Sequence, residues 1–222
     1  MNEPLILSIE TSGATCGVVL AAGSRFLAEY SLFGDNLHDK LLAELCRRIM
    51  NDCSKTFSQL SAVAVSAGPG SFTGLRIGAS VAKGICFGSE IKCLAVPTLS
   101  AFATAATEYA QSVSAQDIMC VTGANQNMFF SQLFDKEGSP KTEILLAEHE
   151  GIESQISERT ILCGPAAPSF TAHLQLSGLN RLTPRFTARH AIHLWNAEAW
   201  IPAEEFVPMY SQEFLVKRTE KK

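Results

Sequence analysis

Gly68-Pro69-Gly70-Ser71-Phe72-Thr73-Gly74-Leu75-Arg76 is a run of nine residues with three glycines and one proline. It follows the apolar run 62–65 and precedes a segment, 77–87, in which apolar residues recur at helical spacing. This order predicts a strand, a glycine loop and the start of a helix. Free backbone N–H groups and the helix dipole make such a loop a natural site for phosphate or another anion. The loop is therefore the first candidate for function.

Two known nucleotide-binding patterns fail at this loop. A Walker A loop needs a lysine and a hydroxyl residue after its last glycine, but Gly74 is followed by Leu75 and Arg76. A dinucleotide-binding fingerprint needs a glycine where Thr73 stands. The loop shape is strongly specified, and a structural or partner-binding role is favoured over an active phosphate role.

A second candidate lies at the end of the first predicted strand, in Glu10-Thr11-Ser12-Gly13. A carboxylate and hydroxyls at a strand end could position a magnesium nucleotide or polarise water. The same residues suit a hairpin turn that satisfies its own backbone, which is the favoured interpretation. The candidate nucleotide or anion site combines both segments: Glu10, Thr11, Ser12, Gly68, Gly70, Ser71, Thr73 and Gly74.

The order of predicted elements repeats along the chain. The first half predicts strands at 5–9, 16–20, 26–31, 62–65 and 91–96, and helices at 37–50, 74–87 and 98–110, with Asn36 as an N-cap and Gly88 as a helix end. The second half predicts strands at 118–121, 128–134, 142–146 and 161–163, and helices at 149–157, 165–174 and 188–200. The pattern predicts an α/β chain of two half-folds, each a mixed sheet with flanking helices. The expected domains are 1–110 and 111–222, joined at the linker 110–116.

The composition excludes several classes of protein. Hydrophobic residues make up 46% of the 222 residues and charged residues 18%, which is enough for a buried core and excludes a disordered chain. The net charge of −4 disfavours unaided binding to nucleic acid. A basic tail is the exception, and a frayed end is favoured there over an RNA contact. That tail carries Lys217, Arg218, Lys221 and Lys222.

The chain shows no secretory signal and no apolar run long enough to span a membrane. Its seven cysteines are odd in number and never spaced as C-x-x-C, which predicts reduced thiols and a cytoplasmic location. His190 and His193 share a predicted helix face, but no third donor is near them in the sequence. The sequence therefore predicts no metal site.

Two predicted helices are candidates for contact with another chain. The helix at 37–50 carries a broad apolar stripe, and the helix at 74–87 is rich in small residues that allow close approach. Packing on their own sheet accounts for one face of each helix. A second, exposed apolar face would mark a partner site.

Four motifs occur here in the order seen in one family. They are Leu7-Ser8-Ile9-Glu10-Thr11-Ser12, the glycine loop with Ile77-Gly78 added, Ala82-Lys83-Gly84 and Val96-Pro97-Thr98-Leu99. The chain resembles the TsaB family of bacterial tRNA threonylcarbamoyladenosine biosynthesis proteins, closely over residues 5–105 and thinly beyond. The resemblance implies the actin-like ATPase (ribonuclease H-like) fold of two tandem half-domains.

The resemblance also implies a non-catalytic scaffold subunit. TsaB pairs with the catalytic subunit TsaD, and with the ATPase TsaE the complex adds threonylcarbamoyl to the tRNA adenosine beside the anticodon. TsaD holds its metal with two histidines in an N-H-x-x-x-H segment, where this chain has Thr98 and Phe102. Because phenylalanine cannot bind a metal, the chain is expected to have no catalytic residue, no metal site and no enzyme activity of its own.

The resemblance places the partner interface on the first two long helices, at Leu37, His38, Leu41, Leu42, Leu45, Arg76, Ile77, Ser80 and Val81. The implied partners are a TsaD-like catalytic subunit and a TsaE-like ATPase, with a homodimer when the chain is alone, tRNA contacted only through the complex, and no membrane. No tightly bound cofactor is implied, and ATP with Mg²⁺ is expected only at the junction of the complex.

Two segments depart from the TsaB pattern. Thr122-Gly123-Ala124-Asn125 replaces a usual Asp-Ala-Arg, and Ser211-Gln212 follows Pro208-Met209-Tyr210 where the family closes with Leu-Arg. An alternative function stays open: an active ATP-dependent phosphotransferase or ATPase of the same fold, using Glu10, Thr11 and the glycine loop.

Overall fold

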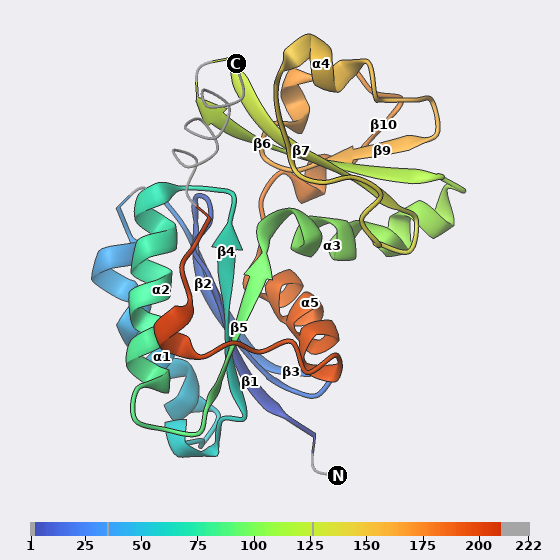
Figure 1. Cartoon of the computed structure of the whole chain (residues 1–222). Coiled ribbons are helices and arrows are strands. Elements are labelled where there is room, and N and C mark those ends of the chain that lie inside the picture. The colour runs from blue at the N-terminus through green and yellow to red at the C-terminus, as the bar shows by residue number, and fades with distance from the viewer. Residues whose placement is uncertain (1–2, 35, 126, 210–222) are drawn as a thin grey trace.

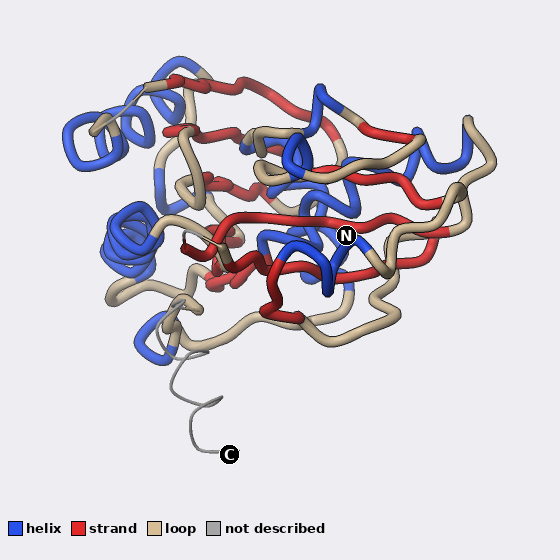
Figure 2. The backbone as a smooth tube through the Cα atoms, turned by 90° about the horizontal axis from the view of Figure 1, so that it is seen from above, coloured by secondary structure: helices blue, strands red, loops and turns tan. Residues whose placement is uncertain are grey.

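The computed structural model describes residues 3–34, 36–125 and 127–209, which form two five-stranded sheets with flanking helices (Figure 1). Seen from above, helices flank the strands (Figure 2). The predicted fold class, an α/β chain of two mixed sheets, is confirmed. Within the described ranges, no helix is long and apolar enough to cross a membrane.

The first sheet has the strand order β3-β2-β1-β4-β5. β1 (Leu5–Glu10), β2 (Thr15–Ala22) and β3 (Arg25–Phe33) form an antiparallel meander. β4 (Ala62–Gly68) and β5 (Lys92–Pro97) continue the sheet in parallel with β1. The helices α1 (His38–Asp52) and α2 (Phe72–Cys86) lie side by side on one face of this sheet (Figure 1).

The second sheet repeats this topology in the order β10-β9-β6-β7-β8. β6 (Asp117–Asn125), β7 (Met128–Asp135) and β8 (Leu145–Glu148) form the meander, and β9 (Thr160–Cys163) and β10 (Leu174–Gln175) the parallel part. The five-residue helix α4 (His149–Glu153) occupies the place of α1 in the chain order, and the 3₁₀ turn Ala167–Ser169 that of α2. The predicted internal repeat is therefore present in the strands, with much shorter helices.

The last helix of each half packs on the other half. α3 (Thr98–Ser112) follows the first sheet but lies against β6 and β9, and α5 (Pro184–Asn196) follows the second sheet but lies against β1 and β2. The two helices also contact each other (Figure 1). One buried cluster accordingly holds residues of both halves, such as Leu94, Phe102, Ile118 and Ala191. The expected boundary between residues 110 and 111 stays a prediction.

Two local expectations were wrong. Asn36 does not cap α1: it adopts a positive φ of 56°, which asparagine tolerates, and Leu37 takes the N-cap position without a side-chain hydrogen bond. The helix expected at 165–174 is a short 3₁₀ turn followed by β10. Pro165 and Pro168 lack the N–H that a helix needs, and Gly164 before them has a φ of 107°, so the chain turns there instead.

Candidate functional site

The glycine loop and the β1–β2 turn, predicted as one site, are in direct contact. The backbone N–H of Ser71 donates to the carbonyl oxygen of Ser12 at 2.7 Å. A Cβ atom on Gly70 would lie 2.3 Å from that same oxygen, and one on Gly74 would lie 2.1 Å from the carbonyl oxygen of Thr11. Since carbon and oxygen cannot approach so closely, these two glycines are needed for packing.

The other two motif glycines are also covered by protein atoms. A Cβ atom on Gly78, one turn further along α2, would lie 2.3 Å from Thr11 Oγ1. Gly68 has a φ of 96°, and its missing side chain leaves room for the carbonyl oxygen of Met209, which a Cβ atom would meet at 2.7 Å. The glycine spacing thus matches the contact of α2 with the end of β1. This packing role is one that the sequence reasoning did not assign.

The start of α2 supplies its own cap. Ser71 Oγ accepts the N–H of Gly74 at 3.2 Å, and the Ser71 carbonyl accepts the N–H of Leu75. The exposed side chains of Ser71 and Thr73 border an open hollow of about 650 Å³ that also reaches His38 and Asp39 at the start of α1. An anion or nucleotide role for this loop stays a prediction.

Glu10, at the end of β1, is fully buried and holds together three separate segments. Its Oε1 accepts the backbone N–H of Ser12 at 2.7 Å and the Ser12 hydroxyl at 2.5 Å. Its Oε2 accepts the hydroxyls of Ser66 on β4 at 2.9 Å and Thr187 on α5 at 2.8 Å. Burial raises the pKa of Glu10, and these hydrogen bonds partly oppose that rise. The carboxyl group therefore connects the β1–β2 turn, β4 and α5 by hydrogen bonds.

A second chain of hydrogen bonds joins α1 to the second half. His38 Nε2 lies 3.0 Å from the carbonyl oxygen of Thr15, and Thr15 Oγ1 donates to the carbonyl oxygen of Leu182 at 2.7 Å. Sequence reasoning found neither this contact nor that of Thr187 with Glu10, because the partners lie 167 and 177 residues apart. No local pattern could have signalled them.

A small cavity of about 170 Å³ lies beside Glu10, between the two sheets. Its wall includes Thr98 and Phe102 from α3, Thr122 from β6, and Asn180 with Arg181 from the loop before α5. The hydroxyl oxygen of Thr98 and the amide oxygen of Asn180 are buried without a hydrogen-bond partner. Polar groups left in that state are uncommon in folded proteins.

The predicted partner face divides into buried and accessible side chains. Leu42 and Leu45 are buried in the core of the first half, so they cannot present their side chains to another chain. Leu37, His38 and Leu41 on α1 and Ile77 and Val81 on α2 are half-buried, and Arg76 and Ser80 are exposed. These accessible side chains remain as the predicted interface.

His190 on α5 packs against α3, whereas His193 is exposed. His190 Nδ1 lies 2.9 Å from the hydroxyl oxygen of Thr104 on α3, and burial lowers the pKa of His190 to about 4. Its ring centre is 6.1 Å from that of His193. Among the residues that the structure describes, no group of three potential ligands is placed to hold a metal ion.

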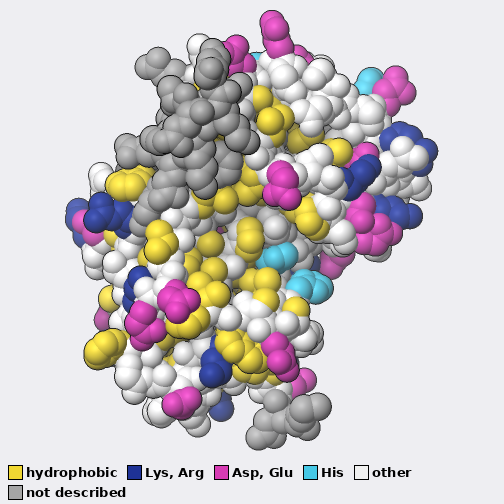
Figure 3. Space-filling model, in the orientation of Figure 1, with side chains coloured by type: hydrophobic (Ala, Val, Ile, Leu, Met, Phe, Trp, Pro, Cys, Tyr) yellow, Lys and Arg dark blue, Asp and Glu magenta, His cyan; other side chains and the backbone are white. Residues whose placement is uncertain are grey.

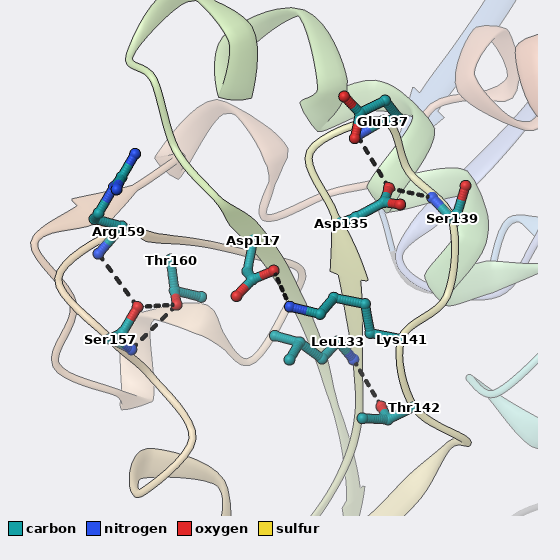
Figure 4. Close-up of polar contacts among 10 residues, drawn as sticks. All are labelled: Asp117, Leu133, Asp135, Glu137, Ser139, Lys141, Thr142, Ser157, Arg159 and Thr160. Atoms are coloured by element: carbon teal, nitrogen blue, oxygen red, sulfur yellow. Dashed lines mark hydrogen bonds and ion pairs between the residues drawn. The ribbon is translucent and has the colours of Figure 1, made fainter.

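A wider hollow of about 730 Å³ lies at the far end of the second sheet and is bordered by charged residues. Figure 4 shows how these residues pair with one another: Lys141 Nζ lies 2.6 Å from Asp117 Oδ1, and Asp135 Oδ1 accepts backbone N–H groups of Glu137 and Ser139. The contacts close the turn after β7. Lys141, Asp117 and Asp135 thus have partners within the protein.

Comparison with known proteins identifies the family. Residues 34–149, just over half of the chain, match the family model described as "TsaD: tRNA N6-adenosine threonylcarbamoyltransferase". The chain is 30% identical to the TsaB protein of Haemophilus influenzae over 135 residues, and 35% identical to that of Bacillus subtilis over 98 residues. The chain belongs to the TsaB–TsaD family.

The matched region is partial. The match to the H. influenzae TsaB protein covers 60% of this chain and 55% of that protein. The match to the B. subtilis TsaB protein covers 44% of this chain and 43% of that protein. The chain thus spans about half the length of the curated TsaB relatives it matches.

Solved structures agree in fold. Two chains of Pseudomonas aeruginosa, one titled "YeaZ" and one described as similar to "peptidase YEAZ", align with TM-scores of 0.77 and 0.79, at 22% and 20% identity, over 93% of this chain and 99% of their own. The ethanolamine utilization protein EutJ of Carboxydothermus hydrogenoformans aligns more distantly, with a TM-score of 0.51. The chain therefore shares the fold of these two Pseudomonas aeruginosa proteins in both halves.

Two substitutions on α2 test the packing role of the motif glycines. Gly74→Ala should lower the free energy of unfolding by about 1–3 kcal/mol or more, because its Cβ atom would overlap the Thr11 carbonyl oxygen. Gly84→Ala is the matched control, since nothing lies within 4 Å of its Cβ position. That change should raise stability by roughly 0.5–1 kcal/mol. Urea unfolding measures both, and equal stability of the two variants would contradict the packing role.

Glu10 should make stability depend on pH. Because its folded-state pKa is raised above the ordinary value of 4.5, its contribution is fully present below pH 4.5 and is lost as pH rises toward the folded-state pKa. Glu10→Gln keeps hydrogen-bonding ability and cannot ionise. The wild-type chain should therefore lose stability relative to Glu10→Gln as urea unfolding is repeated at increasing pH above 4.5. A difference that stays constant with pH would show that Glu10 titrates normally.

Proposed function

We propose that this chain takes part in tRNA threonylcarbamoyladenosine biosynthesis as a non-catalytic scaffold subunit. In this role it binds and supports a TsaD-like catalytic subunit, which works with a TsaE-like ATPase on the tRNA adenosine beside the anticodon. The observation that carries the proposal is the match of residues 34–149, a region that contains α1, α2 and α3. The names of the curated relatives support the same pathway.

Two buried residues of α3 support the proposal that the chain has no enzyme activity of its own. Thr98 and Phe102 stand where the resemblance places the metal-binding histidines of TsaD. Thr98 is 3% exposed and Phe102 is 1% exposed within the core. A phenyl ring cannot bind a metal, and the threonine has no neighbouring ligand cluster among the described residues. Neither residue can replace the histidine ligands that the resemblance places here.

The alternative, an ATPase or phosphotransferase of this fold, is less well supported. The cavity beside Glu10 holds about 170 Å³, whereas ligand pockets typically hold about 300–1,000 Å³. Both oxygens of Glu10 already accept hydrogen bonds, so the carboxyl group has little capacity left for a hydrated metal. Nucleotide with Mg²⁺ is instead proposed to bind only at the junction between subunits.

The accessible face of α1 and α2 is the proposed partner surface. Its apolar members are Leu41, Ile77 and Val81, which are half-buried against the core of the first half, and Phe72, which is 41% exposed at the start of α2. Arg76 and Ser80 are exposed on α2 beside them. Small and apolar side chains on adjacent helices allow another helix to pack closely. Without its partner, the chain is proposed to self-associate through the same face as a homodimer.

Contact with tRNA is proposed to occur only through the complex. Acidic, basic and hydrophobic side chains are interspersed on the face drawn in Figure 3, without one continuous basic surface there. The net charge of −4 agrees with this. The basic tail Lys217, Arg218, Lys221 and Lys222 lies outside the described residues. A cytoplasmic location follows from the proposed pathway.

Ser80→Arg tests the partner face. Ser80 is exposed, and its hydroxyl donates only to the Arg76 carbonyl at 2.8 Å, so arginine should leave the fold intact. Its bulk and charge should weaken binding to the TsaD-like subunit of the same organism at least about tenfold, or roughly 1.4 kcal/mol. Size-exclusion chromatography with light scattering and a calorimetric titration measure the complex.

Ser112→Arg is the matched control. Ser112 is also an exposed helical serine, and its hydroxyl donates to the Glu108 carbonyl at 2.8 Å, but it lies at the end of α3. This variant should bind like the wild-type chain. Equal binding by both variants would contradict the proposed face, and no complex with the wild-type chain would contradict the proposed function.

A further inference from the structure

The cavity between the two sheets has the features of a binding site rather than of a packing defect. It lies where the β1–β2 turn, the start of α3, β6 and the loop before α5 meet, so both halves of the chain build its wall. At about 170 Å³ it exceeds the space of a single water molecule, roughly 30 Å³ in the liquid. It can therefore hold a small molecule or a cluster of waters.

Two oxygen atoms on the wall lack partners within the protein. Thr98 is 97% buried by its neighbours, being only 3% exposed, and its Oγ1 forms no hydrogen bond. Asn180 Oδ1, in the loop before α5, is also buried and forms no hydrogen bond. Leaving such atoms unsatisfied costs free energy that a bound hydrogen-bond donor would recover. The interior thus favours a ligand that donates.

The cavity wall has an acidic residue in its interior and a basic residue at the protein surface. Of the described lining residues, Glu10 is completely buried and Arg181 is exposed. The guanidinium carbon of Arg181 lies 4.6 Å from the centre of the Phe33 ring, which helps to hold the side chain in place. A ligand with a donating, positive end inside and a carboxylate at the mouth would match this arrangement.

The rest of the wall is mixed in character and leaves little space. Ser12, Thr15 and Thr122 lie there with the apolar Ala14, Phe102, Pro165 and Leu182, so the cavity suits a small apolar or hydroxylated side chain. From the unpartnered oxygens, the separated charges and the volume, we propose that this cavity binds a small α-amino acid, with its ammonium group near Thr98 and Asn180 and its carboxylate at Arg181. The site is independent of the proposed partner face and of the scaffold function.

Titration of the purified chain with single compounds tests this site. The probes are glycine, L-alanine and L-threonine, with methylammonium as the amine without a carboxylate and acetate as the carboxylate without an amine. At least one amino acid should bind with a dissociation constant on the order of 1 mM or tighter, measured by calorimetry and by the rise in unfolding temperature. Methylammonium and acetate should each bind at least about tenfold more weakly.

Thr98→Val separates binding from folding. Because Thr98 Oγ1 makes no hydrogen bond, this nearly isosteric change should leave the unfolding temperature of the free chain within about 2 °C and should weaken amino-acid binding at least about tenfold. Thr107→Val, also on α3 but outside the cavity, is the control and should bind normally. Arg181→Gln should weaken amino-acid binding and leave methylammonium binding unchanged.

Three results would overturn the proposal. The first is no binding of any amino acid, which leaves ordered water as the content of the cavity. The second is binding that Thr98→Val does not change, which places the ligand elsewhere. The third is methylammonium binding as tight as that of the amino acids, which removes the role of Arg181. None of them bears on whether the chain binds a TsaD-like subunit.

Discussion

The close approach of α2 to the end of β1 determines where α2 lies on the first sheet, and with it the position of α1. Gly70, Gly74 and Gly78 have no side chains where the backbone of the β1–β2 turn and the Thr11 hydroxyl come within 2.1–2.3 Å of their Cβ positions. Any larger residue would force the helix away from the strand. The contact fixes the direction of α2, and α1 packs beside it on the same face. The glycines thus determine the position of the two helices that carry the proposed partner surface.

The same turn connects the two halves of the chain. Glu10 and Thr15 flank it, and their hydrogen bonds reach Thr187 on α5 and the Leu182 carbonyl just before that helix. Because α3 and α5 each cross to the opposite sheet, the halves share a buried cluster rather than meeting at an exposed joint. This arrangement leaves a cavity of about 170 Å³ beside Glu10, between the two sheets.

Local patterns in the sequence were sufficient for most of the fold. Alternating and continuous apolar runs predicted the strands of both meanders. The helical spacing of Leu42, Leu45 and Ile49 predicted α1. They failed where prolines and a positive φ interrupt the chain at 164–168, since periodicity does not register the missing N–H groups. The network around Glu10 could not be predicted, because Ser66 and Thr187 are distant in sequence and only the folded chain brings them together. Likewise, the apolar stripe of α1 did not reveal that Leu42 faces its own core.

The glycine loop therefore has a physical explanation that needs no phosphate. Its glycines are required for contact with the β1–β2 turn, its serine caps α2, and the neighbouring carboxyl group is saturated by hydroxyl and N–H donors. We propose that this chain supports a partner and does not process nucleotide. Calorimetric titration of the isolated chain with Mg-ATP tests it most directly. We expect no binding in the micromolar range, whereas micromolar binding that Glu10→Gln abolishes would show that the chain itself holds a nucleotide site.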